Sequence, residues 1–163
     1  MSRRSREELI AAGVEAIRGW QTDQDIFDDA AATYGRLNRT DTRVIDIVQR
    51  AGRMSAGEIA TAARLTSGAV TAVIDRLEAA GFACRVRDTE DRRRVLVEVT
   101  PALDELMRPV FGPLAEEGYG AMAEYDDDRL EVIVEFMERA RASLVHHTAR
   151  VFELIAERDA APD

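Results

Sequence analysis

The hydrophobic positions follow two different periods between residues 65 and 100. Four apolar residues recur at helical spacing and share one face of a helix expected over residues 66–80: Val70, Val73, Ile74 and Leu77. From residue 93 to residue 99, apolar and polar residues alternate, which predicts a strand. A second short strand is expected over residues 82–87, and the polar residues 88–91 suit a turn between the two. The pattern therefore predicts a helix followed by a β-hairpin.

Local signals define the ends of this helix and of the one before it. Thr66 is a suitable N-cap, and Gly81 stands where a left-handed residue would end the helix. Ser55 and Glu58 have the spacing of a capping box, which predicts a shorter helix that ends just before Leu65. Two short helices joined this closely form a helix-turn-helix, whose second helix usually enters the major groove of DNA.

This unit resembles the MarR family of winged helix-turn-helix transcription regulators. The residues that carry the similarity are Leu65-Thr66, Gly68-Ala69-Val70-Thr71, Asp75-Arg76-Leu77-Glu78, Gly81, Asp91, Arg93, Val97, Val99 and Thr100. The flanking segments match the family only in the length and order of their helices. The resemblance implies a mainly α fold with a small β-hairpin wing, in which the N- and C-terminal helices form a homodimer.

The segments before this unit are predicted to be helical. One helix is expected over residues 5–17, with an interruption at Gly19 and a second helical segment that starts at Thr22 and ends near Gly35. Thr40 is expected to start a third helix. The buried side of that helix would consist of Val44, Ile47, Val48 and Ala51.

Two further helices are predicted after the wing. Thr100-Pro101 starts the first of them, and Pro109 and Gly112-Pro113 predict a kink or a break within it. Residues 126–128 are acidic and suit the start of a last helix that runs to about Glu157. Its length of about 50 Å exceeds what a domain of this size covers alone, so we expect it to pack on a partner chain. The expected division is 1–37 for N-terminal dimerisation helices, 38–101 for the DNA-binding domain and 102–163 for C-terminal dimerisation helices.

The charge of the chain is unevenly distributed. The net charge is −9, and all 22 basic residues are arginines. Residues 1–103 carry 16 arginines and 16 acidic residues, whereas residues 104–163 carry 6 and 15. DNA binding depends on the field at the contact face more than on the total charge, so the acidic segment is expected to face away from DNA. No apolar run reaches the ~20 residues of a membrane span, and a single cysteine fits a cytoplasmic protein.

Candidate DNA contacts lie on the second helix of the helix-turn-helix and on the wing. On the helix they are Thr66, Ser67, Gly68, Thr71, Ala72 and Arg76. Small residues let a helix approach base edges, where hydroxyls bond either partner and methyl groups meet thymine. On the wing, Arg92, Arg93 and Arg94 follow Asp91. The resemblance implies that Arg93 enters the minor groove with Asp91 as its orienting partner. The alternative is a solvated helix and hairpin tip.

The resemblance also implies binding partners. A homodimer with two recognition helices would read a pseudo-palindromic double-stranded DNA site, with half-sites ~10 base pairs apart. Small aromatic effectors would bind between the dimerisation and DNA-binding parts and release the repressor. The candidate pocket aromatics are Trp20, Phe27, Tyr34 and Phe111, for which ordinary core packing is the alternative.

Other functions have less support in the sequence. Cys84 is interpreted as a packing residue rather than a redox sensor, because it starts a wing strand and has no neighbouring Lys or His. His146 and His147 point about 100° apart on a helix and do not readily share one metal ion. No nucleophile–base pair, phosphate loop or metal cluster indicates an enzyme, and no cofactor is expected. A winged-helix module that binds proteins instead of DNA remains the alternative function.

Overall fold

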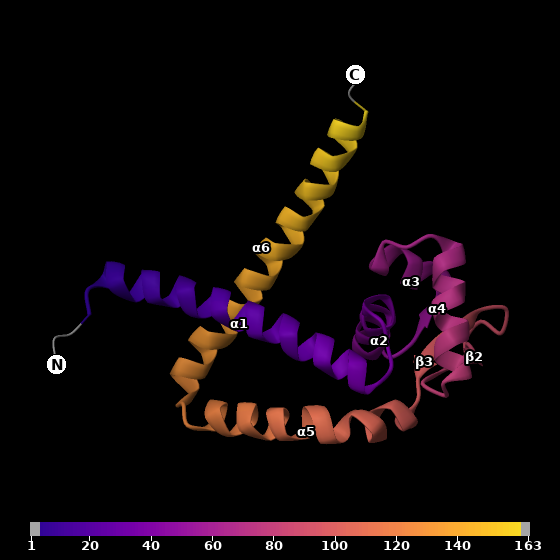
Figure 1. Ribbon diagram of the computed structural model, residues 1–163, viewed down its shortest axis with the longest axis horizontal. Helices are drawn as coiled ribbons and strands as arrows, with labels where there is room; N and C mark the ends of the chain where they lie inside the picture. Colours follow the sequence, from indigo (N-terminus) through magenta and orange to yellow (C-terminus); the bar gives the residue numbers. More distant parts are fainter. Residues whose placement is uncertain (1–3, 161–163) are drawn as a thin grey trace. The chain divides into compact units, whose positions relative to one another are not determined.

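The computed structural model describes residues 4–160 and divides the chain into two compact units, one up to Gly112 and one from Pro113. The first unit holds α1 (Arg6–Tyr34), α2 (Arg39–Ala51), β1 (Met54–Ser55), α3 (Ala56–Ala63), α4 (Ser67–Ala79), β2 (Ala83–Arg87), β3 (Val95–Val99) and the first part of α5 (Pro101–Ala123). The second unit holds the rest of α5 and α6 (Asp127–Asp159). The predicted mainly α fold with a small β wing is confirmed (Figure 1).

The core of the first unit lies among α2, α3, α4 and the sheet. The inward residues predicted for α4 are all buried, with exposures between 0% and 3%. They pack with other buried side chains from neighbouring elements: Val44, Ile45, Val48, Ile59, Ala63, Ala83, Val97 and Leu103. On α2, which begins at Arg39 with Asn38 as its N-cap, Ile45 rather than Ala51 belongs to the buried side; Ala51 is the last residue of the helix and is exposed.

The predicted caps of the helix-turn-helix are confirmed. The Ser55 hydroxyl accepts from the Glu58 N–H, and Glu58 accepts from the Ser55 N–H at 2.7 Å. The Thr66 hydroxyl accepts from the Ala69 N–H, and Gly81 follows α4 with φ of +77°. Only a residue without a Cβ adopts this φ readily, so Gly81 turns the chain from α4 toward β2 at little cost.

The wing contains one strand that the sequence analysis did not predict. The sheet has the order β1-β3-β2, and both pairings are antiparallel. Met54 lies opposite Val97, and Ala83 lies opposite Val99. Because β1 has only two residues, it shows no period of its own. It ties the start of α3 to the central strand of the wing. Strand β3 begins at Val95 and not at Arg93, so the three arginines belong to the turn.

The predicted interruption of the first helix at Gly19 is wrong. α1 is one helix of 29 residues, and Thr22 does not cap a new segment, because its hydroxyl donates to the Arg18 carbonyl within the helix. A glycine inside a helix costs only about 1 kcal/mol relative to alanine, which a helix of this length tolerates.

The predicted break in α5 does not occur either. The helix runs from Pro101 to Ala123 through Pro109 and Gly112-Pro113. Its first turns are held by Leu103, which is buried in the core of the first unit. The start of α6 is confirmed, with Asp126 as its N-cap, and its 33 residues contain none that the described chain buries. None of the helices in residues 4–160 has the length and apolar character needed to cross a membrane.

Candidate nucleic-acid interface

The outward face of α4 is made of small residues at its N-terminal end. Ser67, Gly68, Thr71 and Ala72 are all exposed. A Cβ on Gly68 would meet nothing within 4 Å, so this side of the helix is open to a close approach. The Thr71 hydroxyl donates to the Ser67 carbonyl at 3.0 Å and keeps its acceptor sites. The positive end of the helix dipole adds an attraction for phosphate at the same place.

The charged residues of α4 are paired with other parts of the chain. Asp75 and Glu78 both bind the guanidinium of Arg85 on β2, at 2.8 Å for Asp75. Hydrogen bonding to Asp75 raises the pKa of Arg85. Arg76 binds Asp41 of α2, whose carboxylate is almost completely buried. The open outward surface at the N-terminal end of α4 is therefore formed by small, uncharged residues.

The structure separates the three wing arginines that the sequence places together. The Arg94 guanidinium binds Glu58 of α3 at 3.0 Å and lies 3.9 Å from Asp88. The side chains of Arg92 and Arg93 are exposed and form no ion pair with any residue from 4 to 160. Asp91 accepts from the backbone N–H of Arg93 at 3.0 Å, so it shapes the turn rather than holding the guanidinium. Arg92 and Arg93 are therefore the wing-tip arginines that no carboxylate of residues 4–160 holds.

Sequence reasoning missed three residues that position the interface: Asp41, Glu58 as an anchor for the wing, and Arg85 as a clamp on α4. Asn38 and Asp41 form a capping box, with the Asn38 N–H donating to Asp41 at 3.1 Å. That spacing is visible in the sequence. The partners of Asp41 and Glu58 on α4 and the wing lie 35 and 36 residues away, so no local pattern marks them. Hydrogen bonds from Ser55 lower the pKa of Glu58, and Arg94 lowers it further.

A cleft of about 790 Å³ lies among α1, α2 and the first turns of α5. Its apolar lining consists of Ala31, Ala32, Leu37, Ile45, Leu103, Met107 and Phe111. Of the predicted pocket aromatics, Phe111 lines the cleft. The ring of Phe27 contacts the ring of Phe111 edge-to-face, with ring centres 5.4 Å apart. Trp20 and Tyr34 are exposed and lie outside the lining.

The rim of the cleft carries both signs of charge. Arg39 pairs with Asp29, and Arg50 pairs with Asp46, each at 3.0 Å. Arg43 also lines the cleft, and it forms no ion pair within the described residues 4–160. This arginine is available to an acidic ligand, whereas Arg50 is already occupied.

Cys84 lies in an environment that keeps its thiol protonated. Burial raises the pKa of the Cys84 thiol, and the carboxylate of Glu98, 3.7 Å from the sulfur, raises it further. Glu98 is itself held by Arg53 at 2.6 Å.

We expect alkylation of Cys84 by iodoacetamide to be slow. Because the raised pKa shifts the thiolate to higher pH, the midpoint of the rate against pH should lie above that of the urea-unfolded chain. Glu98→Gln should lower the midpoint by removing the neighbouring negative charge. A folded-state midpoint at or below the unfolded one would contradict this prediction. Mass spectrometry of the alkylated protein gives the rates.

The two histidine rings contact each other on α6. The rings of His146 and His147 lie edge-to-face with centres 5.2 Å apart. Within residues 4–160, no cluster of three or more His, Cys, Asp or Glu side chains is arranged to hold a metal ion.

The sequence comparisons agree with this geometry. The sequence profile of the MarR family matches residues 37–95, which contain the helix-turn-helix and most of the wing. The chain is 38% identical over 139 residues to the uncharacterized HTH-type transcriptional regulator YcgE of Bacillus subtilis, covering 85% of this chain and 90% of the relative. The chain belongs to the MarR family. It is a relative of proteins named as transcriptional regulators.

Solved structures of MarR family proteins share the fold. The chain is similar to a MepR mutant from a multidrug resistant S. aureus clinical isolate, with a TM-score of 0.64 and 15% identity over 80% of this chain and 96% of that one. It is also similar to MepR in the S. aureus MepR–DNA complex, with a TM-score of 0.51 and 17% identity over 78% and 96% of the two chains. The winged-helix fold of this MarR protein is thus confirmed.

Proposed function

We propose that this MarR protein is a transcriptional repressor that binds a pseudo-palindromic DNA site as a homodimer. The observation that carries the proposal is the open N-terminal half of α4 together with the wing-tip arginines Arg92 and Arg93, which form no ion pair within the described chain. In this arrangement Ser67, Gly68 and Thr71 meet base edges in the major groove, and Arg93 enters the flanking minor groove. MepR of S. aureus, which has a similar fold, has been solved in complex with DNA, and this supports DNA binding by the fold.

The helices outside residues 38–101 supply the dimer interface in this proposal. α1 and α6 expose large apolar residues along their length, and α6 in particular buries none of its residues in the described chain. Those on α6 are Val132, Val134, Phe136, Met137, Leu144, Val145, Val151, Phe152, Leu154 and Ile155. A surface of this kind is stable in water only when a partner covers it.

The function is tested with a duplex that the wild-type protein selects from a random-sequence pool. Fluorescence anisotropy should show binding that survives excess non-specific competitor, falls steeply with salt, and saturates at two chains per duplex. Failure to enrich any duplex, with only competitor-sensitive binding at low salt, would reject the repressor. The winged-helix module that binds proteins would then be the better interpretation.

The cleft among α1, α2 and α5 is the proposed effector site. Its apolar lining with Phe111 suits an aromatic ring, and Arg43 at the rim suits an acidic group on that ring. A ligand releases DNA only if it binds the two arrangements of the protein unequally. Because the lining suits an aromatic ring and the rim arginine suits an acidic group, we propose aromatic carboxylates as the effector class.

Benzoate is a suitable first probe of this cleft. It should lower the affinity of the wild type for the selected duplex, and Arg43→Ala should raise the half-effective concentration about tenfold, because one charge-assisted hydrogen bond is lost. Arg50→Ala is the matched control, since Arg50 lines the same cleft but is paired with Asp46. Equal shifts for both variants, or no release of DNA at any benzoate concentration, would argue against this class of effector.

A further inference from the structure

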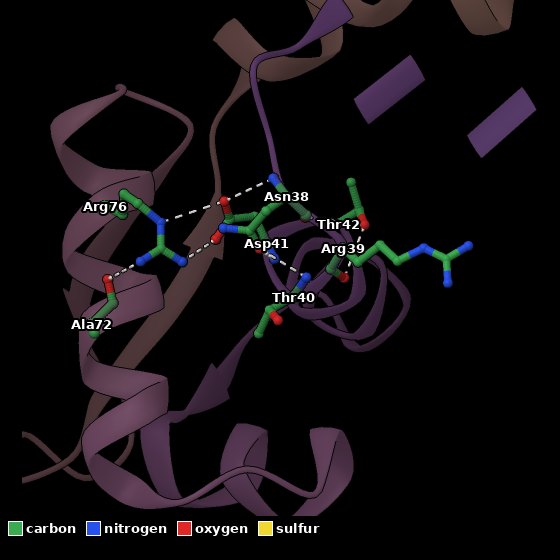
Figure 2. A network of polar contacts seen from close by, with 7 residues as sticks. All are labelled: Asn38, Arg39, Thr40, Asp41, Thr42, Ala72 and Arg76. Atoms are coloured by element: carbon green, nitrogen blue, oxygen red, sulfur yellow. Dashed lines mark hydrogen bonds and ion pairs between the residues drawn. The ribbon is translucent and has the colours of Figure 1, made fainter. Parts of the chain in front are cut away.

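We propose that Arg76 is a positioning residue rather than a DNA contact, and that Asp41 holds it so that α4 keeps a fixed orientation on α2. Figure 2 shows the Arg76 guanidinium pointing from α4 to the carboxylate of Asp41 at the start of α2. Its Nη2 lies 2.5 Å from Oδ1 of Asp41, and its Nε lies 3.4 Å from Oδ2. The inference rests on the proposed binding of DNA through α4.

Asp41 is itself fixed in place. It is the only charged residue among those that the described chain buries, with 3% of its surface exposed. Besides the guanidinium, it accepts the backbone N–H of Asn38 at 3.1 Å, while the Asn38 side chain accepts from the N–H of Asp41 at 3.0 Å. A carboxylate that is removed from water and bonded from two sides binds its cation in a defined geometry. Its position in α2 therefore sets the position of Arg76.

The guanidinium of Arg76 is largely engaged by the protein, which disfavours a simultaneous contact with DNA. Nη2 and Nε engage Asp41, and Nη1 lies 3.4 Å from the carbonyl of Ala72, one turn earlier on α4. The side chain is about half exposed, and each of its three nitrogens has a partner in the protein. Hydrogen bonding to Asp41 also raises the pKa of Arg76. If Arg76 moved away from Asp41 to bind DNA, the buried carboxylate would lose its cation, and the free energy of the protein would rise.

The same short stretch of α2 borders the effector cleft. In Figure 2, Arg39 extends away from Arg76 on the other side of α2. Arg39 binds Asp29 of α1 at 3.0 Å and lines the cleft. The start of α2 thus contacts α1 through the exposed Arg39 and holds α4 through the buried Asp41. A ligand that shifts α2 in the cleft would turn α4 through this pair, which gives the positioning residue a regulatory consequence.

A mutant cycle with the selected duplex tests the proposal. The variants are Arg76→Ala, Asp41→Asn and the double variant. If Arg76→Ala does not fold, Arg76→Lys takes its place, because Arg76→Lys and Asp41→Asn both nearly conserve the side-chain volume. Affinities are measured for the selected duplex and for poly(dI-dC) over a salt series, and the folded state is checked by circular dichroism.

Each single variant should weaken binding to the selected duplex about tenfold, and the double variant should be no weaker than either single one. The salt slope and the affinity for poly(dI-dC) should stay at the wild-type values, because no phosphate contact is lost. Compared with Arg76→Ala, Arg76→Lys should keep part of the preference for the selected duplex over poly(dI-dC), since lysine retains the charge but not the two-donor geometry.

Three results would overturn the inference. A salt slope smaller by about 0.9 for Arg76→Ala would make Arg76 a phosphate contact. Additive effects of the two single variants would show that the residues act independently. Unchanged affinity for the selected duplex would remove any role. A wild type that fails to prefer the selected duplex would instead reject the proposed function, so the two failures are distinguishable.

Discussion

Replacing Arg93 by alanine is expected to weaken binding to the selected duplex by about ten- to a hundredfold. Arg93 is exposed at the wing tip, and its guanidinium has no ion-pair partner within residues 4–160. It is therefore free to enter a narrow minor groove, where the negative potential is concentrated. Loss of one such contact should also reduce the slope of log affinity against log salt concentration by about 0.9. Fluorescence anisotropy over a salt series measures both quantities.

The matched control is Arg139→Ala on α6. This variant removes the same charge from an exposed arginine that forms an ion pair with Glu135 in the preceding turn. It should change neither the affinity nor the slope beyond a small general effect of net charge. If Arg93→Ala behaves like Arg139→Ala, the wing tip is solvated, as the alternative interpretation of the hairpin holds, and the proposed minor-groove contact is wrong.

Leu144→Glu is expected to convert the dimer into a monomer and to weaken DNA binding by about a hundredfold or more. Leu144 is 62% exposed on α6 and lies seven residues after Met137 on the same apolar face. In a dimer this face is buried, and a carboxylate there has no partner. A monomer engages one half-site only and loses the gain in affinity from a second linked contact. Sedimentation velocity gives the mass, and anisotropy gives the affinity.

Arg139→Glu provides the control for the introduced carboxylate. It also adds negative charge to α6, but at a residue whose side chain is 81% exposed on another face of the helix. This variant should remain a dimer. If Leu144→Glu also sediments as a dimer and binds the selected duplex normally, α6 is not the dimer interface, and another exposed apolar face, such as that of α1, becomes the candidate.

The parts of the fold that follow from short-range rules were predictable. The caps at Ser55 and Thr66 and the left-handed Gly81 each depend on residues within one turn of the chain. The inward face of α4 follows from its helical period. Where these rules were applied to a single glycine or proline, they overestimated its effect. The long helices α1 and α5 continue without a break through Gly19 and Pro109.

The candidate interface was predictable only in part. The small residues of α4 and the exposed Arg93 could be found from the helical period and from the resemblance to a family. β1 could not, because a strand of two residues exists only through its pairing with Val97 and Leu96. Phe111 of the cleft and Phe27 meet through the packing of α1 against α5, and nothing in their spacing indicates that contact.

The sequence by itself determined most of the helices, the caps at Ser55 and Thr66 and the inward face of α4, because these depend on interactions within a few residues. Only the tertiary structure decided which arginines are free. Arg76 and Arg94 resemble Arg93 in the sequence, yet Asp41 and Glu58 hold them across 35 and 36 residues. A carboxylate acts on whichever guanidinium the fold brings within about 4 Å, and that distance is set by the packing of α2, α3, α4 and the wing. The chemistry of each arginine is therefore a property of the folded chain.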